Sequence, residues 1–335
     1  MNKPLLSICI PTRNRAEYLR KSLDSLVSQI EFPQIEVIVL DNASTDGTQT
    51  VGVEYQEKFQ NVFYHRNNED ISDRNFPSIA MLAHGTYRKL FNDTALFKPE
   101  SLRFLLDIIQ KYKKQRPVLF FLNNQTTPIK IKPETDCREF SRFCRITGHR
   151  LTWISSFGLW EEDCENLEAE FPICDTRLWQ TYKTLQLASQ KKQVILLEKE
   201  ILTLQLVSNK VLLYGLYTVF YKNFPALLEP YIESGELSEK DLKFIKKDQF
   251  FTQALTWIFK TDKIYDACEY GDEVSFKDLI LAEYRDEPYY KKFQRRNKIK
   301  QKYKSILFSF KESLEKSRFG QKLISLKRKI HLKLY

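Results

Sequence analysis

The sequence predicts an α/β fold, with a mainly parallel sheet covered by helices on both faces and a helical C-terminal extension. Two observations carry this prediction for the sheet. Short apolar runs alternate with helix-length amphipathic segments over the first 120 residues. The first two apolar runs also end in polar turns, at Thr12–Asn14 and Asp41–Asn42. Beyond about residue 210 the pattern becomes helical, which predicts the extension.

The strands and helices of the first part follow in a regular order. Strands are predicted at 5–11, 34–40, 61–65, 86–91 and 117–122, and helices at 15–29, 46–59, 74–84 and 99–113. The first helix carries one apolar stripe, formed by Leu19, Leu23, Leu26 and Ile30. The fourth is predicted to begin near Pro99 and to gather its apolar residues on one face, namely Leu102, Leu105, Leu106 and Ile109.

The later segments divide the rest of the chain. The regular spacing of apolar residues is lost from about 123 to 150, and residues 123–128 are predicted to form a loop at the end of a strand. A turn is predicted at Glu233–Glu236, around the one glycine of that stretch. We therefore expect a sheet domain at 1–210, a helical extension at 211–290 and a basic amphipathic tail at 291–335.

Composition excludes several classes of protein. No run of eighteen uncharged apolar residues occurs in the 335-residue chain, so no membrane-spanning helix is expected. The first strand follows the N-terminus without a signal-peptide pattern, which predicts a cytoplasmic protein. The six cysteines contain no Cys-x-x-Cys pair and the four histidines no His-Glu-x-x-His spacing. Reduced, mostly buried thiols are expected rather than a zinc site or disulfides.

The tail carries the positive charge of the chain. Residues 291–335 hold sixteen Lys or Arg against Glu312 and Glu315, while the net charge of the whole chain is +10. Apolar residues recur at helical steps between the charges, at Phe319, Leu323, Leu326, Ile330 and Leu334. Such a helix is predicted to contact an anionic membrane surface. The alternative is a solvated helix packed on the domain. No nucleic-acid partner is expected, since the pattern matches no RNA- or DNA-binding module.

The two polar turns indicate a binding site. The carboxyl ends of parallel strands meet at one edge of a sheet, where α/β folds bind ligands. The side chains of Thr12, Arg13 and Asn14 from the first turn, with Asp41 and Asn42 from the second, suit a base, a ribose and a phosphate. The sequence lacks both the Gly-x-Gly-x-x-Gly fingerprint and the P-loop pattern, which argues against a dinucleotide site and a P-loop.

Pro11–Arg15 followed by Asp41–Thr48 resembles the opening of family 2 glycosyltransferases with the GT-A fold. The resemblance covers residues 5–110 well and reaches about 180. It implies a nucleotide-sugar site with Pro11, Thr12, Asn14 and Asp41 near the base and ribose, Asp41 accepting a hydrogen bond from the base. The alternative is that Asp41 and Asn42 only end a strand, and that Thr45 or Asp46 caps the next helix.

The resemblance also implies residues that hold the diphosphate. The family's acidic metal-binding motif matches a degenerate segment here, in which Asn92 precedes Asp93, the only acid. Asp93 would then ligate Mg²⁺ or Mn²⁺; the alternative is a plain strand-end turn. Further upstream, residues 67–76 resemble the family's Asn…Gly…Arg-Asn segment without its usual glycine, and Arg74, at a predicted helix start, would hold the donor's phosphate or base. Its alternative role is an ion pair with Asp70 or Asp73.

Transfer to a sugar hydroxyl needs a base that removes the hydroxyl proton. The family's carboxylate for this step matches Asp175, with Cys174 where the family often has Glu. Its alternative role is a helix N-cap. The other candidates for the base are the acids of the cluster Glu161–Asp163. The alternative is that this cluster is a solvated loop. Trp153 and Trp160 suit either sugar stacking or the core.

The resemblance implies an inverting glycosyltransferase that uses a UDP- or dTDP-sugar and acts in cell-surface polysaccharide synthesis. The acceptor would be a glycan or lipid-linked glycan, reached from the cytoplasm or from the inner face of the cell membrane. The alternative is a nucleotide-sugar-binding or scaffold protein that has lost turnover, because its acidic motif is degenerate. A nucleotidyltransferase is a third reading, disfavoured because the Gly-rich opening and Lys that bind a triphosphate are missing.

Overall fold

The structure is a computed structural model that describes residues 3–29, 31–205, 215–256 and 276–295. The chain divides into two compact units, Met1–Lys277 and Asp278–Tyr335. The expected boundary near 210 and most of the basic tail lie outside the described residues, so the three-part division stays a prediction.

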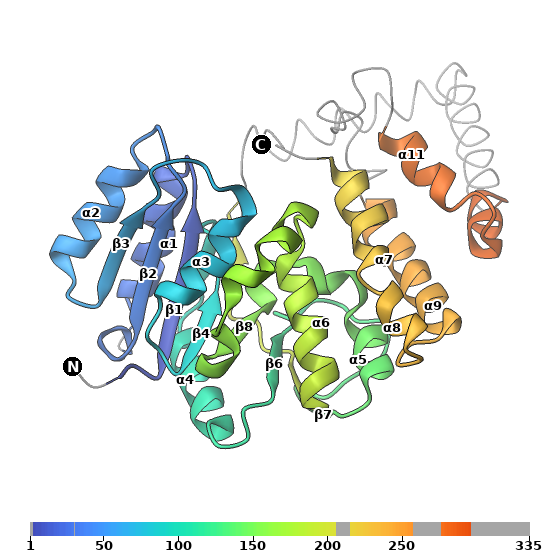
Figure 1. Cartoon of the computed structure of the whole chain (residues 1–335), viewed down its shortest axis with the longest axis horizontal. Helices are drawn as coiled ribbons and strands as arrows, with labels where there is room; N and C mark the ends of the chain where they lie inside the picture. The colour runs from blue at the N-terminus through green and yellow to red at the C-terminus, as the bar shows by residue number, and fades with distance from the viewer. Residues whose placement is uncertain (1–2, 30, 206–214, 257–275, 296–335) are drawn as a thin grey trace, which may run out of the picture. The chain divides into compact units, whose positions relative to one another are not determined.

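The central sheet of the first unit has five strands in the order β3-β2-β1-β4-β8. Figure 1 shows them in this order from left to right. The first four strands are mutually parallel and β8 is antiparallel to β4. Their bounds are β1 Leu6–Thr12, β2 Glu36–Asp41, β3 Val62–Arg66, β4 Tyr87–Leu90 and β8 Gly158–Trp160. The predicted mainly parallel sheet is confirmed, with one antiparallel strand that the sequence did not reveal.

Two smaller sheets accompany the central one. The first has the order β6-β9-β7 and the second pairs β10 with β5. Their strands are β5 Ala95–Phe97, β6 Val118–Phe121, β7 Glu134–Cys137, β9 Val194–Leu197 and β10 Leu202–Leu204. The strand predicted at 117–122 therefore exists, but it belongs to a separate sheet. The region without a clear period contains β7 and a short helix, α5 Phe140–Thr147.

The four predicted helices of the first part are all present. They are α1 Ala16–Val27, α2 Thr48–Lys58, α3 Asn75–Leu82 and α4 Ser101–Tyr112. The last begins at Ser101 rather than near Pro99, because Glu100 adopts a left-handed conformation with φ of 63°. Leu19, Leu23 and Leu26 are fully buried as predicted, while Ile30 lies outside the described residues.

Helices cover both faces of the sheet because each strand alternates its apolar side chains between two cores. On one face Ile8 and Val37 pack with the leucines of α1 and α4. On the other face Cys9 and Ile38 pack with Ile79 of α3. The second of these cores continues into α6 Trp179–Lys191 and into the later helices.

The described residues after 215 are mainly helical, as predicted. They contain the π-helical segments η7 Thr218–Asn223 and η8 Phe250–Ala254 and the helices α7 Phe224–Ala226, α8 Glu229–Glu233 and α9 Glu239–Gln249. The predicted turn follows α8, where Gly235 has a φ of +80° that favours glycine. The helix α11 Phe276–Glu283 follows the next undescribed stretch.

Short 3₁₀ segments connect these elements. They are η1 Phe32–Gln34, η2 Ser72–Arg74, η3 Gly148–Thr152, η4 Ile154–Ser156, η5 Glu161–Cys164 and η6 Leu167–Thr176. Within the described residues, no helix is long and apolar enough to cross a membrane.

Candidate functional site

The two polar turns meet at the carboxyl edge of the sheet, as predicted. Thr12 and Asp41 are register partners at the ends of β1 and β2, and the N–H of Asn42 donates to the carbonyl of Thr12 at 2.9 Å. Asn14 has a φ of 51° and ties the turns together. Its N–H donates to the Ser44 hydroxyl at 2.9 Å, and its side-chain oxygen accepts the N–H of Thr45 at 2.7 Å. The turns therefore form one rigid surface.

Asp46 has the capping role that was its alternative in the sequence. One carboxylate oxygen accepts the N–H of Thr48 at 2.9 Å, at the start of α2. The other accepts the N–H of Ala16 at 3.2 Å, at the start of α1. Asp46 therefore satisfies donors at the starts of two helices.

Asp41 lies beneath this surface rather than on it. Its side chain is fully buried, and its two carboxylate oxygens accept from the N–H of Ser44 at 2.8 Å and from the Tyr64 hydroxyl at 2.6 Å. Burial, and then the bond to Asp41, raise the pKa of Tyr64. Both oxygens thus have protein partners. A direct contact of Asp41 with a nucleobase stays a prediction.

An exposed ion pair lies above Asp41 and Asn42. The Asn42 amide donates to one oxygen of Asp70 at 2.6 Å and accepts the N–H of Ile71 at 3.0 Å. The other oxygen of Asp70 pairs with Arg13, and both side chains are about a third exposed. Sequence reasoning missed this pair, because nothing in the spacing shows that the loop after β3 returns to the first turn.

Arg74 forms neither of the two alternative ion pairs. Asp70 pairs with Arg13, and Asp73 pairs with Arg177 at 2.9 Å. The exposed Arg74 guanidinium instead lies 6.0 Å from the centre of the Phe171 ring. Within the described residues it has no carboxylate partner, so its charge is available to an anionic ligand.

Asp93 contacts the first turn directly. Its carboxylate accepts the hydroxyl of Thr12 at 2.9 Å, and the N–H of the preceding Asn92 donates to the Ser155 hydroxyl at 3.1 Å. Thr12 and Asp93 were predicted from separate motifs 81 residues apart. The structure brings them together because β1 and β4 are adjacent parallel strands.

A divalent cation would depend on Asp93. Among the residues that the structure describes, no cluster of three His, Cys, Asp or Glu could hold a metal ion by itself. One partly buried carboxylate fits a hard cation that takes its other ligands from phosphate oxygens and water. The residues therefore fit a cation that arrives with a diphosphate ligand.

Asp175 is an exposed carboxylate near the end of η6. The described residues give it no hydrogen-bond partner, and its alternative role as an N-cap is not observed. The hydroxyl of Thr176 instead accepts the N–H of Leu178 at 3.2 Å, just before α6. The neighbouring Cys174 thiol is buried, and burial raises its pKa to about 12.

The η6 segment is fixed at both of its sides. Glu170 accepts from Trp179 at 2.7 Å and from Lys183 at 2.6 Å, which holds the segment on α6. Arg177 donates to Asp73 and to the Ser72 hydroxyl, which holds it on η2. Asp175 and Arg74 therefore lie on two segments that pack together.

The rival acids have structural partners. Glu161 and Glu162 pair with Arg116 at 2.9 and 2.5 Å, and Asp163 pairs with Lys191 at 2.7 Å. Trp160 is 1% exposed and packs edge-on against Tyr87 in the core. Trp153 also packs against that core.

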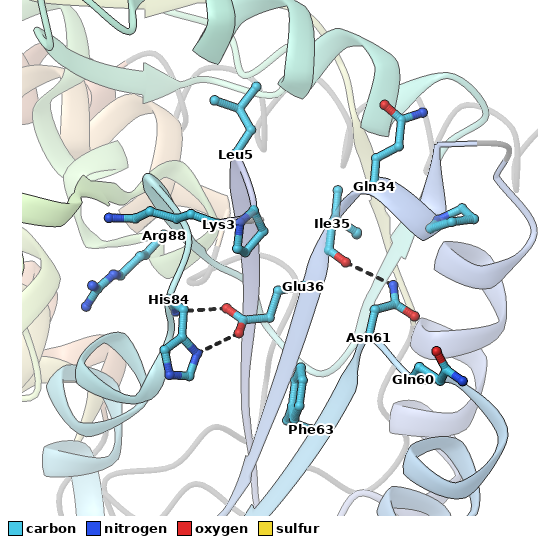
Figure 2. A pocket seen from close by; sticks show the side chains of 12 residues that line it. Lys3, Leu5, Gln34, Ile35, Glu36, Gln60, Asn61, Phe63, His84 and Arg88 are labelled. Carbon is cyan, nitrogen blue, oxygen red and sulfur yellow. Dashed lines mark hydrogen bonds and ion pairs between the residues drawn. The ribbon is translucent and has the colours of Figure 1, made fainter. Parts of the chain in front are cut away.

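A groove of about 970 Å³ lies at the opposite edge of the sheet, where β1 to β4 begin. Figure 2 shows its polar groups bound to one another: Glu36 accepts from the N–H and the ring of His84, and Asn61 donates to the carbonyl of Ile35. It shares no residue with the predicted donor site.

Comparison with known proteins finds a family match for the first part of the chain. Residues 7–137 match the model of glycosyl transferase family 2. The abequosyltransferase RfbV of Salmonella typhimurium is 36% identical over 127 residues, which are 37% of each protein. An uncharacterized glycosyltransferase of Rickettsia typhi is 30% identical over 117 residues, 35% of this chain and 36% of that protein. The match thus spans little more than a third of these curated relatives.

Solved structures extend the likeness in fold. Residues 1–349 of TarS from S. aureus, in complex with UDP-GlcNAc, align with a TM-score of 0.53 at 17% identity, covering 77% of this chain and 76% of that one. The mannosyltransferase PcManGT from Pyrobaculum calidifontis, in complex with GDP-Man and Mn²⁺, aligns with a TM-score of 0.50 at 14% identity, covering 98% and 85%. Residues 7–137, which carry the paired N-terminal turns, thus match glycosyl transferase family 2, and the chain has the GT-A fold.

Proposed function

We propose that the chain is an inverting glycosyltransferase that moves a sugar from a UDP- or dTDP-sugar to a hydroxyl of a glycan. The observation that carries the proposal is the contact between Thr12 and Asp93 at 2.9 Å. It joins the two polar turns, which would bind the nucleotide, to the Asn92–Asp93 turn, which would bind the diphosphate. The Arg74 guanidinium, which has no carboxylate partner among the described residues, adds a positive charge for the phosphates. The TarS complex with UDP-GlcNAc agrees with a UDP-sugar donor, and the abequosyltransferase relative agrees with sugar transfer.

The donor would lie along the carboxyl edge of the sheet. Pro11, Thr12 and Asn14 form the wall for the base and ribose, and Asp41 supports that wall from below through Ser44 and Tyr64. The diphosphate would meet Arg74 on one side and the Asn92–Asp93 turn on the other. A Mg²⁺ or Mn²⁺ ion bound by Asp93 and the phosphate oxygens would neutralise charge on the leaving group.

Asp175 would act as the base. A carboxylate without a hydrogen-bond partner is free to accept the proton of an acceptor hydroxyl as that oxygen attacks the anomeric carbon. Attack from the face opposite the diphosphate inverts the configuration at that carbon. The structural partners of Glu161, Glu162 and Asp163 make them poorer candidates.

The helical extension would form part of the acceptor side. Asn223 of η7 donates to the carbonyl of Thr176 at 3.0 Å, one residue from Asp175. In the same segment, Tyr217 and Tyr221 stack with ring centres 6.0 Å apart. Tyr221 is buried, so the partly exposed ring of Tyr217 is the one that would meet a sugar face. The acceptor would be a glycan or lipid-linked glycan of a cell-surface polysaccharide.

The substitution Asp175→Asn tests the base. We expect release of nucleoside diphosphate from the donor to fall by about 10²- to 10⁴-fold, with donor affinity retained. Glu162→Gln is the matched control, since it removes the charge of an acid that pairs with Arg116. Retention of the wild-type rate by Asp175→Asn would remove this residue from the mechanism.

The alternative is a nucleotide-sugar-binding protein without turnover. It is favoured by one observation, that Asp93 is the only acid of its turn. In that case the wild-type chain would bind a donor and Asp93→Ala would weaken binding. Neither would release a diphosphate, with or without Mn²⁺.

The basic tail would place the enzyme at the inner face of the cell membrane, with the catalytic domain in the cytoplasm. Each basic residue near an anionic surface contributes about 1 kcal/mol of binding free energy. We expect the full chain, but not a chain lacking 291–335, to sediment with vesicles containing phosphatidylglycerol. Equal sedimentation of the two chains would show that the tail does not provide the membrane contact.

A further inference from the structure

Lys89 is a buried lysine next to the predicted diphosphate turn. It lies in β4, four residues before Asp93, and its side chain is fully buried. The ammonium donates to the carbonyls of Ser155, of Phe157 at 2.8 Å and of Leu90 at 3.4 Å. It also lies over the rings of Phe91 and Phe121, 4.5 and 4.7 Å from their centres.

The contacts fit a charged lysine. Three carbonyl oxygens match the three N–H groups of an ammonium, whereas a neutral amine has two and would turn its lone pair toward a carbonyl. Aromatic faces also attract a cation. Within the described residues, no carboxylate forms an ion pair with Lys89. Burial lowers the pKa of Lys89 well below its usual range, so this positive charge is costly without an anion nearby.

A short path links this charge to the candidate donor site. Ser155 accepts from Lys89 through its carbonyl and from the N–H of Asn92 through its hydroxyl, at 3.1 Å. Ser155 is 1% exposed, so little water lies between them. The Lys89 ammonium is thus one residue removed from the turn that carries Asp93.

We propose that Lys89 is a built-in counter-charge for the diphosphate of the donor. The inference rests on the proposed function, because it needs a diphosphate at the Asn92–Asp93 turn. The lysine touches no ligand, since it is fully buried. It acts through its field, which a low-dielectric interior screens weakly. A fixed cation in this position supplies positive charge where the acidic motif offers a metal only one carboxylate.

The test compares a diphosphate with its nucleoside. Binding to the full chain is measured by calorimetry for UDP and uridine, dTDP and thymidine, CDP and cytidine, and GDP and guanosine, without added metal. In the pair that the wild type prefers, Lys89→Met should weaken diphosphate binding on the order of tenfold and leave nucleoside binding unchanged. Lys89→Gln, which keeps N–H donors for the carbonyls, should act in the same direction and covers the case in which the Met variant does not fold.

Two control variants separate charge from structure. Lys191→Met removes another largely buried lysine, one that pairs with Asp163, and should leave the ratio of diphosphate affinity to nucleoside affinity at its wild-type value. Ser155→Ala cuts the tether to Asn92 but keeps the charge, so it should lower this ratio less than Lys89→Met. A folded Lys89 variant with the wild-type ratio of diphosphate to nucleoside affinity would overturn the inference. So would a fall of this ratio in Ser155→Ala that equals the fall in Lys89→Met. A wild-type chain that binds none of the four diphosphates would overturn the proposed function and the inference together.

Discussion

Asp41 and Tyr64 form the buried hydrogen bond on which the nucleotide turns rest. The carboxylate and the hydroxyl are 2.6 Å apart, and the second oxygen of Asp41 holds the N–H of Ser44. Ser44 in turn accepts the N–H of Asn14. The path from Tyr64 to Asn14 means that a residue outside the donor site supports its shape.

Tyr64→Phe tests this support. Removing the hydroxyl leaves a buried oxygen of Asp41 without its close donor, and we expect a loss of about 1–3 kcal/mol in the free energy of unfolding. Nucleotide affinity should fall as well, because the Ser44 turn loses its support. Denaturant unfolding and calorimetry measure the two effects. Tyr55→Phe is the control, since its hydroxyl bonds to Asp24 instead of to Asp41. Equal nucleotide affinity in wild type and Tyr64→Phe would show that the turn does not need this bond.

Local sequence signals predicted some site residues well and others incompletely. Asp46 stands next to a helix start, so its capping role could be read from its neighbours. The partners of Asp41 and Arg13 come from β3 and the loop that follows it. Those contacts form only when the strands pair, and no local pattern encodes them.

The η6 segment links the loop of Arg74 to the start of α6. It contains Pro172 and is followed by Arg177, whose φ of 62° is unusual for a residue with a side chain. The guanidinium of Arg177 donates hydrogen bonds to Asp73 and Ser72. Burial raises the pKa of Asp73 even with Arg177 beside it. This contact orients the segment that carries Asp175.

Arg177→Ala tests the contact at the level of the segment. The change leaves the partly buried Asp73 without its cation, so η6 should shift away from η2. We expect kcat for donor hydrolysis to fall by at least about tenfold, with a smaller change in the donor KM, because a displaced η6 no longer holds Asp175 in position. Arg138→Ala is the control, because it breaks an exposed ion pair with Asp136. An unchanged kcat would exclude a positioning role for Arg177.

Elements with long, periodic patterns were predicted correctly, and short ones were missed. The leucine stripe of α1 and the apolar runs of β1 and β2 fix both their type and their place. Among the missed strands, β5, β8 and β10 have three residues each, too few for a period. Pairing of β8 with β4 and of β5 with β10 is what makes them strands.

At the scale of the whole molecule, a buried ionic cluster joins the sheet domain to the helical region. Arg150 of η3 pairs with Asp248 of α9 at 2.6 Å, and both side chains are nearly fully buried. The ring of His149 lies 3.6 Å from the same carboxylate. Burial lowers the pKa of His149 despite that neighbour.

This cluster predicts a loss of stability on mild acidification. The unfolded chain has the higher pKa for His149, near 6.5, so below that pH it binds a proton that the folded chain excludes. The free energy of unfolding should therefore fall as the pH drops from about 7 toward 5. Melting temperatures measured over this range in the wild type and in His149→Gln check the sign. The slope should flatten in His149→Gln but persist in His84→Gln, whose side chain is 75% exposed. A wild-type slope retained by His149→Gln would assign the effect to other groups.

The central claim is that the carboxyl edge of the sheet holds a nucleotide sugar for transfer. The most direct measurement is the release of nucleoside diphosphate by the wild-type full chain from a panel of UDP-, dTDP-, CDP- and GDP-sugars, with and without Mn²⁺. We expect a UDP- or dTDP-sugar to be bound and slowly hydrolysed, with Mn²⁺ raising the rate through Asp93. Absence of both binding and hydrolysis across the panel would contradict the account.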